Sequence, residues 1–168
     1  LTSAILYAPP GTVERRFVLA HMLQALLPGA PFTVLAPNDK GGTRLAKELA
    51  GFGGEVVNHA KHHHRICNGV RAATLEGIEE AIAAGSMQQH PAHGMWTQPG
   101  IFSWDRIDVG TALLLQHLPE LKGNGADFGC GMGVLSRTVL GSAAVTSLLM
   151  IDIDRRAIAC AQRNIQDV

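Results

Sequence analysis

The stretch that decides the fold is residues 126–133, Ala-Asp-Phe-Gly-Cys-Gly-Met-Gly, together with Asp152, which follows it along the chain. A short apolar run that ends in Asp127 predicts a strand, and the alternating glycines let the backbone turn sharply and lie close to a ligand. Residues 134–140 then predict a helix, and residues 145–151 predict a second strand that ends at Asp152. In a parallel sheet this order puts a carboxylate beside the glycine-rich turn, where it can accept hydrogen bonds from a ribose. The pattern predicts a nucleoside-binding site.

The spacing of the glycines narrows the choice of nucleoside. The dinucleotide fingerprint is G-x-G-x-x-G and directs a helix N-terminus at a pyrophosphate, whereas residues 127–133 read D-F-G-C-G-M-G. This spacing resembles the D-x-G-x-G-x-G loop of class I S-adenosylmethionine-dependent methyltransferases, whose cofactor carries no phosphate. The resemblance implies S-adenosyl-L-methionine as the cofactor. A glycine-rich turn that binds no ligand is the alternative.

The composition is typical of a globular protein with reduced cysteines. Of the 168 residues, 46% are hydrophobic, which is enough to bury a core in one domain or two small ones. The 14 basic and 14 acidic side chains cancel, so any contact with RNA must come from a local patch. Three scattered cysteines, Cys67, Cys130 and Cys160, predict free thiols. Because we find neither an apolar run of membrane-spanning length nor a signal peptide, we expect a cytoplasmic protein with no membrane partner.

The first part of the chain predicts alternating strands and helices. Residues 3–8 and 32–36 are compact apolar runs bounded by prolines and glycines, which indicate buried strands. Residues 12–27 and 43–49 carry apolar side chains at helical spacing behind a threonine cap. This alternation predicts an α/β fold with a parallel sheet. The loop 37–42 lacks alternating glycines, so we interpret it as structural, with a degenerate copy of the nucleotide-binding half as the alternative.

Residues 59–67, His-Ala-Lys-His-His-His-Arg-Ile-Cys, have the most unusual composition in the chain. Imidazole and thiolate groups suit zinc, but three adjacent histidines cannot all face one centre on a strand, and no C-x-x-C pair completes a site. We therefore predict no metal. One interpretation of this stretch is a solvated basic hairpin. The other is a patch that contacts RNA phosphates through Lys61, Arg65 and Arg71.

A stretch rich in proline and glycine, residues 88–100, marks a predicted domain boundary. We place an N-terminal domain at residues 1–92 and the beginning of a second domain at residues 93–168. Both are expected to be α/β, so the second domain would be the start of a Rossmann-like sheet.

Residues 99–115 extend the resemblance to methyltransferases. They follow the pattern P-G-x-F-x-x-D-x-x-D-x-G-x-x-L-L-L ahead of the glycine-rich loop. The two motifs together are similar to those of the ribosomal RNA guanine methyltransferases that modify the exocyclic amine, the group of small subunit methyltransferase C and large subunit methyltransferase G. The similarity is specific over residues 99–164, and it is weaker but collinear before them.

The resemblance implies that both halves of the chain are methyltransferase-like and that only the C-terminal half binds S-adenosyl-L-methionine. The N-terminal half is then an inactive copy that helps to hold ribosomal RNA, with small-subunit RNA the expected partner. The resemblance implies that the glycine-rich loop lies at the cofactor with Asp127, Gly129, Cys130, Gly131 and Gly133. It implies that Asp152 is the carboxylate that binds the ribose, and that Phe102 and Asp108 border the methionine end. For Phe102 and Trp104 ordinary core packing is the alternative.

The chain also departs from this family. The catalytic loop implied by the resemblance is Asn-Pro-Pro-aromatic, placed after a fourth strand, and no such sequence occurs here. We therefore assign no catalytic residue, and we expect the chain as it stands to be inactive. Because two strands are too few for such a sheet, we expect a fragment or truncated reading frame with exposed apolar faces, or a domain-swapped dimer that borrows strands from a second copy.

Two functions of other classes stay open from the sequence. The first is a non-catalytic RNA-binding or assembly module, which would bind RNA in a salt-dependent way through Lys61, Arg65 and Arg71 and would have no affinity for the cofactor. The second is a nicotinamide-dependent oxidoreductase, which the spacing of the glycines disfavours.

Overall fold

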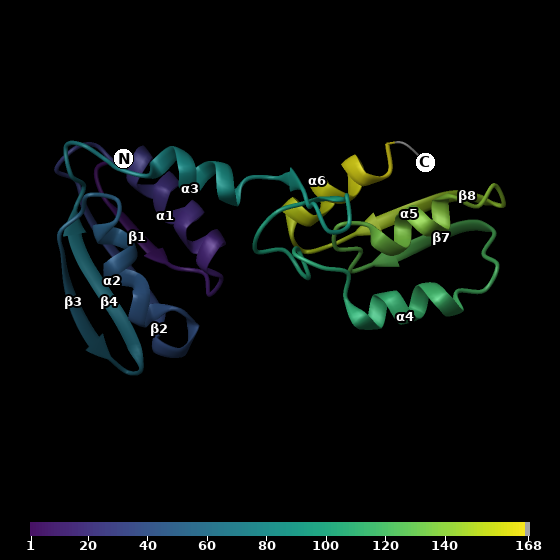
Figure 1. Ribbon diagram of the computed structural model, residues 1–168, viewed down its shortest axis with the longest axis horizontal. Helices are drawn as coiled ribbons and strands as arrows, with labels where there is room; N and C mark the ends of the chain where they lie inside the picture. The colour runs from purple at the N-terminus through teal and green to yellow at the C-terminus, as the bar shows by residue number, and fades with distance from the viewer. Residues whose placement is uncertain (167–168) are drawn as a thin grey trace. The chain divides into compact units, whose positions relative to one another are not determined.

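The computed structural model describes residues 1–166 and divides into two compact units, Leu1–Ser86 and Met87–Val168. We refer to them as the N-terminal and the C-terminal unit, and we describe each by itself (Figure 1). Both units combine strands with helices, which confirms the predicted α/β class. No helix among these described residues is long and apolar enough to cross a membrane.

The N-terminal unit is a four-stranded sheet with three α-helices. Its elements are β1 (Ala4–Tyr7), α1 (Thr12–Ala25), β2 (Pro31–Pro37), the 3₁₀ turn η1 (Asn38–Lys40), α2 (Gly42–Ala50), β3 (Val56–Lys61), β4 (His64–Val70) and α3 (Ile78–Gly85). The strand order is β1-β2-β4-β3. Helix α2 packs on β2 and β4, and α1 packs against α3.

The sheet of the N-terminal unit is mixed: the parallel pairing predicted for its first two strands is confirmed, but it does not extend to the histidine-rich strands. Strands β1 and β2 are parallel, but β4 is antiparallel to both β2 and β3. The reason is the short turn between β3 and β4, where His62 and His63 both have positive φ angles, 48° and 61°. A two-residue turn of this kind joins adjacent antiparallel strands, whereas a parallel connection needs a crossover. The histidine-rich stretch is therefore a hairpin.

The core of the N-terminal unit contains one buried ion pair. The apolar part of this core is formed from both helices and strands, with Leu19, Leu23, Val34, Leu45, Leu49 and Phe52 among its fully or nearly fully buried members. Among them lies Arg15, whose Nε and Nη2 donate to the two carboxylate oxygens of Glu48 at 2.6 and 2.7 Å. Its Nη1 donates to the carbonyl oxygen of Pro10 at 2.7 Å, and more weakly to that of Pro9 at 3.2 Å. The guanidinium is thus satisfied by the turn that ends β1.

The C-terminal unit contains a short ribbon and a pair of parallel strands with helices beside them. Its elements are β5 (Gln88–Gln89), β6 (Trp96–Thr97), α4 (Val109–His117), β7 (Gly123–Phe128), α5 (Val134–Leu140), β8 (Val145–Ile151) and α6 (Arg155–Asn164). Strands β5 and β6 pair antiparallel. Strands β7 and β8 pair in parallel, with Ala126 opposite Leu149 and Phe128 opposite Ile151. Carboxylate caps begin two of the helices, Asp108 at α4 and Asp154 at α6.

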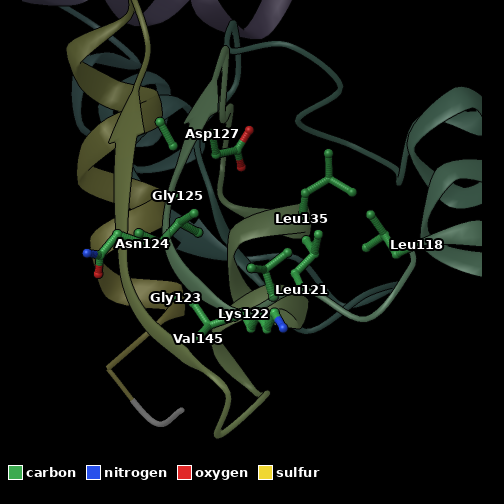
Figure 2. Close-up of a pocket in the computed structure, with 12 residues that line it drawn as sticks. Leu118, Leu121, Lys122, Gly123, Asn124, Gly125, Asp127, Leu135 and Val145 are labelled. Atoms are coloured by element: carbon green, nitrogen blue, oxygen red, sulfur yellow. The ribbon is translucent and has the colours of Figure 1, made fainter.

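Part of the apolar surface of this unit is exposed. Phe128 and Leu149, on β7 and β8, are 78% and 61% exposed. A cavity of about 310 Å³ lies along β7 from Gly123 to Asp127, and the two glycines at 123 and 125 contribute no side chains to fill it. Figure 2 shows this cavity between β7 and the leucines at 118, 121 and 135. Its lining is mainly aliphatic, and we regard it as a packing defect.

Candidate functional site

The glycine-rich loop, residues 129–133, connects β7 to α5 in the C-terminal unit. Gly129, Gly131 and Gly133 have φ angles of 75°, 54° and 84°, in the left-handed region that glycine adopts most readily. The backbone N–H groups of Gly129 and Cys130 both donate to the carbonyl oxygen of Ile151, at 2.8 and 3.0 Å. The loop is therefore tied to the end of the neighbouring parallel strand.

The carboxylate of Asp152 lies against this loop. Its Oδ2 accepts a hydrogen bond from the backbone N–H of Gly131 at 2.8 Å, and its Oδ1 accepts one from the N–H of Asp154 at 2.8 Å. Each carboxylate oxygen has a second lone pair, so Asp152 can still accept hydrogen bonds from hydroxyl groups of a ligand. The structure brings together the two features on which the nucleoside-site prediction depends.

Asp127 is held in place by a residue that the sequence pattern did not indicate. The hydroxyl group of Ser136, which is fully buried in the first turns of α5, donates to Asp127 Oδ2 at 2.6 Å. A second residue of this kind is Asn164, whose side chain donates to the carbonyl oxygen of Met132 at 2.9 Å. Single polar residues inside helices give no motif by themselves, which is why spacing alone did not single them out.

The segment that precedes α4 forms the other wall of the site. A small cavity of about 60 Å³ is lined by this segment and the loop, through Phe102, Ser103, Asp108, Thr111, Gly129, Cys130, Gly131, Met132, Val134 and Leu135. Phe102 is 71% exposed, so it does not pack in a core. Trp104 is half-buried and packs against a small apolar cluster that includes Met95 and Met132. Asp108 Oδ2 accepts from the N–H of Thr111 at 3.0 Å, so this carboxylate also begins α4.

The thiol of Cys130 is buried in the glycine-rich loop. Burial, together with the nearby carboxylates of Asp127 and Asp152, raises its pKa to about 11. The thiol is therefore protonated near neutral pH and is a poor nucleophile. Within residues 1–166, no group of three His, Cys, Asp or Glu side chains is arranged to hold a metal ion.

The three basic residues proposed to contact RNA are spread over the N-terminal unit. Lys61 is exposed at the end of β3, and Arg65 is paired with Ala60 across the hairpin. Arg71 lies just beyond the opposite end of β4, about 20 Å from Arg65 at the rise of an extended strand. Its guanidinium donates to the carbonyl oxygens of Ala72 and Ala73, at 2.6 and 2.7 Å. These side chains do not form one compact patch.

Other cations line a depression at the carboxyl ends of β1 and β2. It has a volume of about 410 Å³ and is bordered by Arg15, Lys40 and Arg44, with Asp39 the acidic residue among its lining. The hairpin turn is tied to this edge because the N–H of Asn38 donates to the carbonyl oxygen of His63 at 2.8 Å. Because Arg15 is paired with Glu48, the exposed cations at this end of the N-terminal sheet are Lys40 and Arg44, with Asp39 beside them.

Comparisons with known proteins give a consistent result. Residues 92–168 match the family described as the methyltransferase small domain. Ribosomal RNA small subunit methyltransferase C of Stutzerimonas stutzeri is 31% identical over 175 residues, which cover 97% of this chain and 50% of the relative. The protein of the same name from Pseudomonas paraeruginosa is 32% identical, with 96% and 49% covered. The chain thus spans about half the length of the curated relatives it matches.

A solved structure shares the fold. It is a 16S rRNA N2 methyltransferase of T. thermophilus, in complex with AdoMet and guanosine, and it matches with a TM-score of 0.77 at 20% sequence identity. The match covers 98% of this chain and 47% of that one. The glycine-rich loop, its carboxylate and these similarities agree: the chain resembles class I S-adenosylmethionine-dependent methyltransferases and, among them, ribosomal RNA small subunit methyltransferase C.

Proposed function

We propose that this chain is part of an S-adenosylmethionine-dependent methyltransferase that modifies the exocyclic amine of a guanine in small-subunit ribosomal RNA. The observation that carries the proposal is the hydrogen bond from the Gly131 N–H to the Asp152 carboxylate, at the carboxyl ends of two adjacent parallel strands. That edge of a parallel sheet is where nucleosides bind. The names of the relatives supply the substrate class, since they are ribosomal RNA small subunit methyltransferases.

The loop can accommodate a cofactor at close range. A Cβ atom placed on Gly129 or Gly131 would have no atom within 4 Å, so the backbone there faces open space. Asp152 would accept hydrogen bonds from the ribose, and the loop residues Asp127, Gly129, Cys130, Gly131 and Gly133 would lie under the methionine moiety, bordered by Phe102 and Asp108. The cavity of about 60 Å³ can hold only part of such a molecule, so the remainder would lie along the open surface of the loop.

The chemistry comes from the sulfonium of the cofactor, whose methyl group is transferred by in-line displacement. The contribution of the protein would be to position the two reactants and to exclude other geometries. A guanine can present its exocyclic amine to such a site only when it is unpaired or flipped out of its stack. The polypeptide therefore needs an RNA-holding surface in addition to the cofactor loop.

We assign RNA holding to residues 1–92 and cofactor binding to residues 93–168. Lys61 and Arg65, beside the hairpin turn, are our first candidates for phosphate contacts, and Lys40 and Arg44 beside the depression are further ones. Arg71 would make a separate contact, because it lies at the opposite end of β4 and its guanidinium already donates to two backbone carbonyl oxygens. A relative of ribosomal RNA methyltransferases would work in the cytoplasm. Strand exchange between two copies stays a prediction.

The proposal is tested by titrating the protein with S-adenosylmethionine in a calorimeter. Asp152→Ala should weaken binding about tenfold to a hundredfold, because one charge-assisted hydrogen bond to a ligand contributes about 1.5–3 kcal/mol. Asp154→Asn is the matched control, because asparagine also caps helices well. The side chain of Asp154 bonds to Arg156, and the backbone N–H that Asp154 donates to Asp152 is kept in the variant. Binding that is equally strong in the parent and Asp152→Ala would contradict the site.

The substrate class needs a separate measurement. The assay measures transfer of a labelled methyl group to RNA extracted from the small ribosomal subunit, followed by digestion to nucleosides. A chain extended to include the Asn-Pro-Pro-aromatic loop should yield label in a guanine methylated at its exocyclic amine, whereas the chain as it stands, which lacks that loop, should transfer none. A protein that binds RNA in a salt-dependent way, but neither binds the cofactor nor transfers label, would instead be the non-catalytic module that the sequence left open.

A further inference from the structure

One buried side chain connects the two walls of the candidate cofactor site. Asn164, the last residue of α6, is 7% exposed. Its Oδ1 accepts from the backbone N–H of Trp96 at 2.6 Å, and its Nδ2 donates to the carbonyl oxygens of Trp96 at 2.8 Å and Met132 at 2.9 Å. The amide thus pairs with Trp96 in the way that a neighbouring strand would, and holds the glycine-rich loop with its remaining donor.

Asn164 is also connected, through a neighbouring residue of β6, to the segment that carries Phe102. Next to Trp96 in β6 is Thr97, a fully buried residue whose hydroxyl group donates to the carbonyl oxygen of Trp104 at 2.9 Å. The guanidinium of Arg163 also lies over the ring of Trp96, 4.0 Å from its centre. Asn164 therefore links the loop residue Met132 to Trp96 in β6 by hydrogen bonds. Thr97, the next residue of β6, is bonded to Trp104, so both ends of the segment 98–104 that carries Phe102 are connected to Asn164.

We propose that Asn164 is a positioning residue, which holds the glycine-rich loop and the Phe102 segment at the separation that S-adenosylmethionine requires. This inference rests on the proposed function, because the separation matters only if a ligand lies between these walls. Asn164 itself touches neither the open face of the loop nor the small cavity.

An asparagine is suited to this task for a chemical reason. Two of the three bonds need a donor and one needs an acceptor, and a carboxamide of this length supplies both. An aspartate would keep the bond from the Trp96 N–H but would place a negative charge against two carbonyl oxygens. In a buried position such unpaired or repelling polar groups are costly, so the loop and the ribbon would move apart.

The test compares Asn164→Asp with Cys160→Ala, a control on the same helix. Cys160 is fully buried in the same apolar cluster and makes no bond to the loop or the ribbon, so its truncation loosens packing without cutting the connection. Thermal unfolding of both variants measures the general loss of stability. Calorimetric titration with S-adenosylmethionine measures whether the two walls still bind the cofactor. The rate of Cys130 alkylation by iodoacetamide, followed by mass spectrometry, measures how well the loop still buries this thiol.

We expect Asn164→Asp to weaken binding of S-adenosylmethionine about tenfold and to speed alkylation of Cys130 severalfold at temperatures well below unfolding. Cys160→Ala should lower the unfolding temperature with less than a twofold change in either measurement. If both variants weaken binding in proportion to their loss of stability, or if Asn164→Asp changes neither measurement, the inference is wrong.

A second variant covers the case in which Asn164→Asp does not fold. Asn164→Gln keeps the amide and displaces it by one methylene, so it should fold and show a smaller change in the same direction; no change relative to the parent would contradict the inference. The alkylation rate needs no cofactor. If the parent chain fails to bind S-adenosylmethionine, the proposed function fails, whereas the role of Asn164 in holding the loop is still decided by the Cys130 rates.

Discussion

Two loops of this molecule follow a parallel strand and precede a helix, and they differ in what lies beside their glycines. In the N-terminal unit, Gly41 has a φ angle of 92°, and a Cβ atom placed on it would lie 2.0 Å from Nη1 of Arg15. In the C-terminal unit, Gly129 has a φ angle of 75°, and a Cβ atom there would have no neighbour within 4 Å. The same backbone conformation thus faces a protein side chain in one loop and open space in the other.

The comparison shows why a similar loop serves structure in one unit and is available for a ligand in the other. The buried ion pair between Arg15 and Glu48 occupies the space beside Gly41 and bonds to the turn after β1. In the C-terminal unit the corresponding partner of the loop is a carboxylate, Asp152, which holds the Gly131 N–H and leaves the outer face free. In the N-terminal loop the Arg15 guanidinium fills the space beside Gly41, whereas in the C-terminal loop the Asp152 carboxylate bonds to the backbone and leaves that space open.

The largest effect should come from breaking the ion pair that closes the first loop. Arg15→Met leaves Glu48 buried without a partner, and such a loss costs about 3–5 kcal/mol of unfolding free energy. Both tryptophans, Trp96 and Trp104, lie in the C-terminal unit, so urea unfolding followed by tryptophan fluorescence should change little. The circular dichroism transition should move to lower urea. The double variant Arg15→Met, Glu48→Leu should recover much of the loss, and a loss as large as that of the single variant would contradict this account.

The next effect sharpens the comparison between the two glycines themselves. Alanine at either position adopts the left-handed conformation at a cost of about 1–2 kcal/mol. Gly41→Ala should lose more than this, because its Cβ also displaces the Arg15 guanidinium from Glu48. Gly129→Ala should lose only the conformational cost, yet it should weaken S-adenosylmethionine binding at least about tenfold, since the methyl group points into the ligand space. Equal losses of stability in the two variants would remove the difference on which the comparison depends.

A smaller effect is expected from alkaline pH at the second loop. The pKa of the Cys130 thiol is raised by burial to about 11 from an ordinary value of 9.0. A group whose pKa is raised by folding contributes stability below its unfolded pKa, and this contribution is lost as pH rises through the interval up to the folded value. Unfolding free energy should therefore fall between pH 9 and 11, on the order of 1 kcal/mol by pH 10. Cys130→Ser should make this part of the profile, measured by urea unfolding, less steep without flattening it, because burial also raises the pKa of Cys160 to about 11. An unchanged slope would show that the Cys130 thiol does not contribute.

The smallest effect concerns the far end of β7, where the C-terminal unit is also loosely filled. Gly125→Ala should stabilise the protein by about 0.5–1 kcal/mol, because it reduces the freedom of the unfolded chain and adds apolar volume at the cavity. Its Cβ would meet only the end of the flexible Leu148 side chain, at 3.3 Å. Gly123→Ala is the contrasting variant, because Gly123 has a φ angle of 76° and its replacement should destabilise. A Gly125→Ala variant of lower melting temperature would show that Leu148 cannot move aside.

The sequence by itself determined the local elements, including those that form the candidate site. Periodic apolar residues, glycines at a fixed spacing and an aspartate at a strand end are local features, and they correctly predicted the α/β class and the strand-loop-helix around residues 126–133. The resemblance to methyltransferases rests on the same short motifs. Such features can be read without knowing the fold because neighbouring residues in the chain are also neighbours in space.

Only the tertiary structure decided how distant segments meet. A hairpin was one of the two interpretations of residues 59–67, but its position depends on a two-residue turn of histidines with positive φ angles and on the pairing of β4 with the distant β2. The roles of Arg15, Ser136 and Asn164 depend on partners that lie 33, 9 and 68 residues away, respectively. The exposure of Phe102 and the commitment of Arg71 to backbone carbonyls are likewise outcomes of packing. Buried polar side chains must find partners wherever the fold places them, so these contacts belong to the folded molecule and not to any stretch of its sequence.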